Sequence, residues 1–238
     1  MRTLGVIGGL GPMATAFFMQ MVIEMTKADT DQEHIEMIVY HCPSIPDRTS
    51  YIVGKSRENP QKPMAAIGKK LAEAGAKVIA IPCITAGCFY EQLSEEISVP
   101  IIHIVEETAK YLIKHNIHTV GLMATDGTIQ SRLFQTAFRD KEIEVILPQK
   151  NTQKDVMHLI YQNVKASNPI EMDRFERVSV ELRNGGAQVI LLGCTELSVI
   201  RRDQKIGAGY LDVMQILAKC SVEQCGILKE EYQQLITQ

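Results

Sequence analysis

The sequence predicts an α/β protein of two pseudo-symmetric lobes, each a parallel sheet flanked by helices, with a functional site in the cleft between them. Two observations support this fold class. Short apolar runs alternate with amphipathic stretches along all 238 residues, and two segments of the first half are echoed in the second half. Near-continuous apolar strands are typical of parallel sheets that are covered by helices on both faces.

Seven apolar runs are expected to form strands, because each is rich in Val and Ile or otherwise apolar and is followed by a helical pattern. In chain order they read LGVIG, EMIVY, KVIAIP, PIIHIV, TVGLMA, IEVIL and QVILLG. Strands that alternate with helices in this way predict parallel pairing through crossover connections.

An internal repeat relates the two halves of the chain. GAKVIAIPC at 75–83 aligns without a gap with GAQVILLGC at 186–194, and TLGVIGGLGP at 3–12 resembles TVGLMATDGT at 119–128. The second pair can be explained by the likeness that strand–helix units share in any α/β protein. The first pair is harder to explain in this way, because both of its strands end in cysteine. We therefore predict a first lobe from 1–100, completed by C-terminal helices at 210–238, and a second lobe from 101–209.

Charge and composition exclude several classes of partner. The formal net charge is −3 with acids and bases interspersed, so there is no basic stripe for nucleic acid and no polybasic arm for a membrane. The uncharged segment 4–23 is interrupted by four glycines and Pro12, so we expect neither a membrane span nor a signal peptide. Six cysteines without an export signal are expected to be reduced thiols in a cytoplasmic protein, and their spacing predicts no metal site.

Cys83 and Cys194 are the candidate chemical groups. Ligands of parallel sheets collect at the carboxyl ends of the strands, where both thiols are expected to lie. Inverting a carbon next to a carboxylate needs a base on one face and an acid on the other. Because a free thiol titrates at about 8.5, a thiol and a thiolate can coexist near neutral pH. A single cysteine is more often a small buried hydrophobe, so the matched positions carry this interpretation.

Five motifs then follow one another in a recognisable order. They are GVIGGLGPMAT at 5–15, IPDRT at 45–49, IPCITA at 81–86, LMATDGT at 122–128 and GCTEL at 193–197. In these motifs the chain resembles the aspartate/glutamate racemase family along most of its length. The resemblance implies an amino-acid racemase that needs no cofactor and no metal, binds a small amino-acid substrate, and is as a rule a homodimer.

The resemblance also assigns roles to particular residues. Cys83 and Cys194 would be the two bases, and Arg48 and Lys165 would face the distal carboxylate of aspartate or glutamate. Dipole compensation alone also favours a lysine at a helix end, and a glutamate such as Glu196 at a helix start. The other substrate-binding residues that it implies are Gly9, Met13, Thr85, Thr125, Gly127, Thr128, Thr195 and Glu196, of which Glu196 would also orient Cys194. The glycine loop around Gly9 would bring bare backbone N–H groups to the α-carboxylate.

The first cysteine motif departs from the usual family pattern. Ile84 stands where the family has asparagine after the cysteine, and Gly87 stands where it has histidine. An isoleucine side chain offers no hydrogen bond to an amino or carboxylate group. The substrate therefore stays open between aspartate, glutamate and another amino acid.

Other functions remain to be weighed against this one. GLGPMA at 9–14 satisfies a dinucleotide fingerprint, but EMIVY runs into His41 and Cys42 rather than the acid that a ribose needs. A dicarboxylate isomerase or decarboxylase would keep both cysteines, and a non-catalytic amino-acid-binding protein would keep the cleft.

We further expect helices at 105–115 and 211–238 as candidate dimer contacts. The histidines are expected to be surface or core groups, with His103 near the lobe boundary as an exception.

Overall fold

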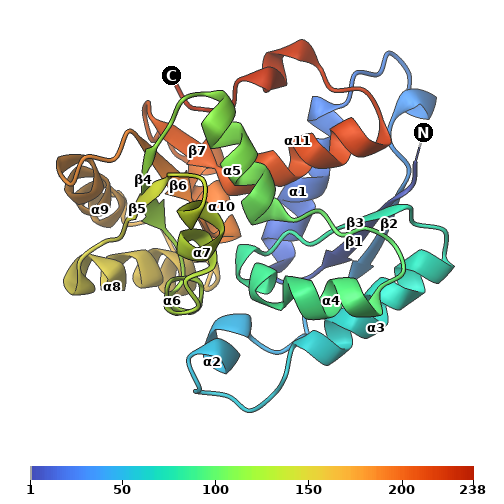
Figure 1. The fold of residues 1–238 in the computed structure, drawn as a ribbon, viewed down its shortest axis with the longest axis horizontal. Helices are drawn as coiled ribbons and strands as arrows, with labels where there is room; N and C mark the ends of the chain where they lie inside the picture. Colours follow the sequence, from blue (N-terminus) through green and yellow to red (C-terminus); the bar gives the residue numbers. More distant parts are fainter. Residues whose placement is uncertain (1) are drawn as a thin grey trace.

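Two parallel sheets organise the chain (Figure 1). The computed structural model describes residues 2–238, so Met1 of the predicted first lobe lies outside it. The first sheet has the order β2-β1-β3 and contains Leu4–Gly8 (β1), Met37–His41 (β2) and Val78–Ala80 (β3). The second has the order β5-β4-β6-β7 and contains Thr119–Met123 (β4), Glu144–Ile146 (β5), Val189–Leu192 (β6) and Tyr210–Asp212 (β7). The predicted α/β fold class, with two parallel sheets, is confirmed.

Helices flank both sheets. In the first half they are Pro12–Met25 (α1), Asp31–Glu33 (η1), Arg48–Ile52 (α2), Gln61–Glu73 (α3), Ile84–Phe89 (η2), Tyr90–Glu96 (α4) and Ile104–Lys114 (α5). In the second half they are Asp126–Gln130 (α6), Leu133–Arg139 (α7), Lys150–His158 (α8), Leu159–Val164 (η3, a π-helix), Met172–Asn184 (α9), Thr195–Asp203 (α10), Val213–Cys225 (α11) and Glu230–Gln233 (η4). The buried faces of the sheets and helices form three apolar clusters, the largest of which contains residues of both halves.

The two sheets repeat one topology. β1 and β4 are central, β2 and β5 lie on one side of them, and β3 and β6 on the other. Beyond β3 there is only a parallel bridge between Ile79 and Ile101, at the position that β7 takes beyond β6. The strand expected at PIIHIV is thus reduced to this bridge, because α5 begins at Ile104 and His103 caps it.

The C-terminal segment differs from the prediction. Tyr210–Asp212 pairs with β6 and so belongs to the second sheet, whereas 210–238 was expected to complete the first lobe. This strand is only three residues long, too short to show a pattern in the sequence.

Helix α11 packs in the interior of the protein. Eleven of its thirteen residues are buried, most of them apolar, as in a helix that packs in a core. It contacts α1 and α5, so most of its surface is buried within the chain, while the dimer contact expected at 105–115 and 211–238 stays a prediction (Figure 1).

The six cysteines are free thiols in this structure. Within residues 2–238, no three side chains of the His, Cys, Asp and Glu types gather closely enough to hold a metal ion. None of the helices in the same range is long and apolar enough to cross a membrane.

We predict that Leu217→Ala in α11 lowers the free energy of unfolding by about 2–5 kcal/mol, because a side chain that is 0% exposed leaves a cavity between helices that cannot fully collapse. Urea-induced unfolding measures this loss. Ile227→Ala is the control, since Ile227 is 66% exposed and should change stability by no more than about 0.5 kcal/mol. Equal effects of the two substitutions would contradict the central packing of α11.

Candidate active site

Cys83 and Cys194 line one small cavity between the lobes. Cys83 lies between β3 and η2, and Cys194 between β6 and α10, so each thiol is the N-cap residue of the helix that follows its strand. Both residues are 6% exposed. The cavity measures about 10 Å³, room for one water molecule at most. The structure is therefore closed around the two sulfur atoms.

A larger pocket of about 530 Å³ opens next to this cavity. Its walls include the loop after β1, the loop before α2, and the end of η3. Met13 lies on its wall and is 56% exposed. The residues that line both spaces are Leu10, Asp47, Arg48, Lys165 and Glu196. A ligand that reaches the thiols from the larger pocket must pass these five side chains.

Glu196 sets the environment of Cys194. The Cys194 thiol donates to Glu196 Oε2 at 3.0 Å, and the Thr195 hydroxyl donates to the same oxygen at 3.2 Å. Burial raises the pKa of Cys194 well above its usual value, and the negative charge of Glu196 raises it further. A Cβ on Gly11 would lie 2.8 Å from Glu196 Oε1, so the glycine makes room for this carboxylate. Cys194 is accordingly a neutral thiol at neutral pH.

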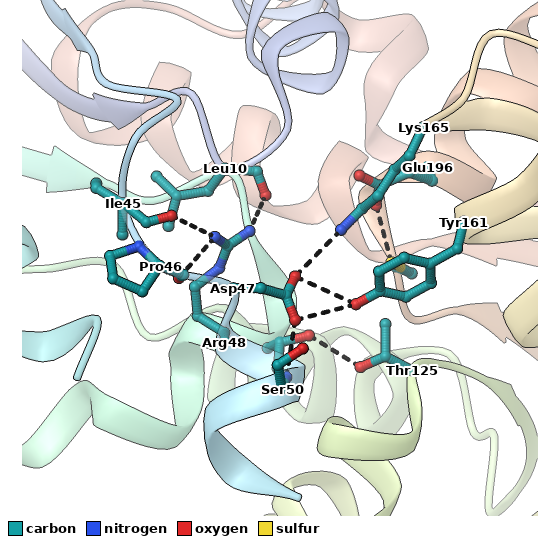
Figure 2. A network of polar contacts seen from close by, with 12 residues as sticks. Leu10, Ile45, Pro46, Asp47, Arg48, Ser50, Thr125, Tyr161, Lys165 and Glu196 are labelled. Atoms are coloured by element: carbon teal, nitrogen blue, oxygen red, sulfur yellow. Dashed lines mark hydrogen bonds and ion pairs between the residues drawn. The ribbon is translucent and has the colours of Figure 1, made fainter. Parts of the chain in front are cut away.

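Arg48 is buried and bound to backbone rather than free in a loop (Figure 2). Its guanidinium donates to the carbonyl oxygens of Leu10 at 2.6 Å, Pro46 at 3.1 Å and Ile45 at 3.4 Å. Nε has no partner among the described residues. Burial acts to lower the pKa of Arg48, but the charges of a Cys83 thiolate, Asp47 and Glu196 raise it overall. Arg48 therefore braces the loop and places a permanent positive charge near Cys83.

Asp47 connects the two lobes across the cleft (Figure 2). It lies 3.5 Å from Lys165 Nζ, and it accepts hydrogen bonds from the Tyr161 hydroxyl at 3.2 and 3.3 Å. Burial acts to raise its pKa, but the hydrogen bond from Ser50 N–H and the charge of Lys165 lower it overall. Burial likewise acts to lower the pKa of Lys165, and the charge of Glu196 and other neighbours outweighs it. Both partners stay charged, so an ion pair closes this side of the site.

Three threonine hydroxyls meet at the lobe boundary. Thr85 Oγ1 of the first lobe lies 3.1 Å from Thr125 Oγ1 and 3.0 Å from Thr128 Oγ1 of the second lobe, which are 3.2 Å apart. Next to them, a Cβ on Gly127 would lie 2.9 Å from Thr49 Cα. Gly127 thus permits the close approach of α2 and α6 that brings the hydroxyls together.

The glycine loop after β1 does not offer all the N–H groups that were expected. Gly9 N–H donates to Thr15 Oγ1 at 2.9 Å, so it has a partner inside the protein. Gly9 is needed for a different reason. Its φ is +94°, and a Cβ there would lie 2.5 Å from the Cys42 carbonyl carbon.

The structure brings most of the predicted site residues together. Those on the small cavity are Cys83, Arg48, Thr85, Thr125, Lys165, Cys194, Thr195 and Glu196. Gly9 and Met13 line the larger pocket, and Thr128 and Gly127 lie behind Thr85 and Thr125. Sequence reasoning missed Asp47 and Tyr161. Asp47 stands inside the IPDRT motif, and Tyr161 precedes Lys165 by four residues, a spacing that places both on one helix face.

The fold and the site define a class of α/β protein in which two related lobes with parallel sheets each present one thiol to a shared, closed cavity. The sequence pattern of the family described as Asp/Glu/Hydantoin racemase matches residues 7–220. The chain belongs to this family.

Similar proteins agree with this assignment over nearly the whole chain. The broad specificity amino-acid racemase RacX of Bacillus subtilis is 28% identical in a match 231 residues long that covers 92% of this chain and 96% of that protein. The Picrophilus torridus aspartate racemase structure superposes with a TM-score of 0.86 at 29% identity and covers 98% of each chain. The glutamate racemase of Francisella tularensis, at 22% identity and a TM-score of 0.65, covers 94% of this chain and 80% of its own, and shares the fold.

We predict that Glu196→Gln makes Cys194 react with iodoacetamide at lower pH than in the unchanged protein, because the carboxylate that opposes ionisation of the thiol is removed. Alkylation of each cysteine is followed by mass spectrometry across a pH series. Glu223→Gln is the matched control, since Glu223 is bound to Lys219 outside the site. An unchanged pH profile for Cys194 would contradict the role given to Glu196.

Proposed function

We propose that the protein is a cofactor-independent amino-acid racemase that moves a proton on and off the α-carbon with Cys83 and Cys194. The observation that carries this proposal is the single cavity lined by both thiols. Their matched positions after β3 and β6 support an approach to one carbon atom from opposite sides.

The two thiols have different surroundings before a substrate binds. Glu196 and burial favour the neutral thiol at Cys194, whereas Cys83 lies beside the positive charge of Arg48. In one direction the Cys83 thiolate removes the α-proton and the Cys194 S–H group delivers its proton to the opposite face. The product leaves Cys83 as thiol and Cys194 as thiolate, the state that catalyses the reverse direction.

Charge that develops on the α-carboxylate needs donors placed in advance. The hydroxyls of Thr85, Thr125 and Thr195 surround the cavity and are proposed to bind this carboxylate. They now bind one another or Glu196, so a substrate would replace these contacts when the lobes part.

The distal side of the substrate is proposed to meet Lys165 and Arg48. Arg48 has five N–H donors and makes three hydrogen bonds to backbone carbonyls, which leaves two N–H groups that are not bound to backbone. Lys165 stays cationic and lines both the cavity and the larger pocket. The distal carboxylates of aspartate and glutamate are complementary to these positive charges. Ile84 on the cavity wall offers no hydrogen bond to a substrate, so another amino acid also stays in the proposal.

A homodimer in the cytoplasm, expected from the resemblance and the cysteine content, stays a prediction. Membership of the racemase family supports the racemase over the alternatives of a dicarboxylate isomerase or decarboxylase and a binding protein that catalyses nothing. Exchange of the α-hydrogen in deuterated water with loss of optical activity identifies the racemase, and saturable binding without exchange identifies the binding protein.

We predict that Cys83→Ser and Cys194→Ser each lower racemisation of the preferred amino acid by at least about a thousandfold, since a serine hydroxyl is a far weaker base than a thiolate. Enantiomer-resolved turnover without added cofactor measures this loss. Cys225→Ser is the control, because this buried thiol lies outside the site. Full activity of either active-site variant would end the two-thiol mechanism.

We predict that Lys165→Met lowers kcat/KM for aspartate or glutamate by about 10- to 100-fold, the loss of one hydrogen bond to a charged group. Methionine keeps the length of the side chain without its charge. Turnover of alanine, which has no distal carboxylate, should fall much less. An equal loss for acidic and neutral substrates would show that Lys165 does not meet the substrate side chain.

A further inference from the structure

A second small cavity lies behind Cys83 and measures about 20 Å³. Its polar wall is formed by Cys83, Tyr90 and His103, and Gly87 lines it without a side chain. Apolar residues close the rest: Ile81, Ala86, Leu93, Ile101, Ile102 and Ile104. Cys83 is the one residue that lines both this cavity and the cavity between the two thiols. The volume has room for one water molecule.

The sheet topology brings His103 to this place. Ile101 forms a parallel bridge with Ile79 of β3, so the chain beyond Ile101 and the chain beyond β3 emerge at the same sheet edge. Cys83 follows one of these ends and His103 follows the other. Gly87 leaves the space between them open, and a Cβ there would already lie 3.2 Å from a methyl group of Leu133. An imidazole thus reaches the rear of Cys83 from α5, although the family motif places its histidine at position 87.

The hydrogen bonds of His103 decide which ring nitrogen carries the proton. Nδ1 accepts a hydrogen bond from Glu106 N–H at 3.3 Å, so the neutral ring carries its hydrogen on Nε2. The ring lies against Tyr90 of α4, with ring centroids 4.0 Å apart. Burial lowers the pKa of His103, and the charges of Glu106, Glu91 and Glu107 only partly oppose this. The ring is therefore neutral at neutral pH and is a donor at Nε2.

We propose that His103 is a positioning residue for Cys83, and that its Nε2–H donates through one water molecule in this cavity to the Cys83 thiolate. A hydrogen bond to the charged form of a group favours that form. The donor acts from the side away from the substrate, so it leaves the sulfur free to approach the α-carbon. The inference rests on the proposed function in that it explains how Cys83 is kept ready as the base.

His103 also caps α5, so the test must separate the two roles. His103→Asn keeps a good capping side chain but is too short to reach the cavity. His103→Gln caps poorly but can place an amide N–H where Nε2–H now lies. The readout is the rate at which iodoacetamide alkylates Cys83 in the full-length protein, followed by mass spectrometry for each cysteine across a pH series. Thermal unfolding of each variant reports the capping role.

We expect His103→Asn to slow alkylation of Cys83 about fivefold at neutral pH, the value of one lost hydrogen bond, with little change in thermal stability. His103→Gln should alkylate within about twofold of the unchanged protein even if it unfolds earlier. The opposite pattern, or no change in either variant, would overturn the proposal and leave His103 as a helix cap. Alkylation needs no substrate, so full racemisation activity in the cysteine variants would count against the proposed function and not against this result.

Discussion

The close approach of the two lobes along one edge is the constraint on which the rest of the site depends. Thr85 meets Thr125 and Thr128 there, and the absence of a Cβ at Gly127 allows the backbone of Thr49 to come close. Buried hydroxyls need hydrogen-bond partners, and Thr85 finds Thr125 and Thr128 only while the lobes are closed. Parting the lobes breaks those bonds, so a ligand that supplies new acceptors can replace them.

The two related thiols have different charged neighbours within their own lobes. Cys83 and Cys194 occupy equivalent places in the repeated topology, but their neighbours carry opposite charges. Glu196 accepts from Cys194, and Arg48 stands near Cys83. In a buried site with little water to screen them, such charges act strongly on ionisation. Two thiols of the same repeat thus have different electrostatic surroundings, which is the asymmetry that the proposed proton transfer uses.

Several parts of the fold and the site were predictable because they are local or repeated. Buried strands show as apolar runs, and the gap-free match of 75–83 with 186–194 placed the two cysteines at equivalent strand ends. Strand β7 was missed because three residues carry too little pattern. Gly9 was predicted to expose its backbone N–H group to a ligand, but this group is bound to Thr15, six residues further along the chain. The ion pair of Asp47 with Lys165 likewise depends on a partner that local patterns do not reveal.

The sequence by itself determined the fold class, the membership of two cysteines in a repeat, and the set of polar residues near them. Periodicity and motif spacing are properties of residues that are close together in the sequence, so they can be recognised without knowing how the lobes pack. Only the tertiary structure decided which charges face which thiol and that Arg48 is tied to backbone carbonyls. It also placed His103 behind Cys83. These depend on contacts between residues far apart in the chain, whose geometry is set by the packing of the two sheets and their helices.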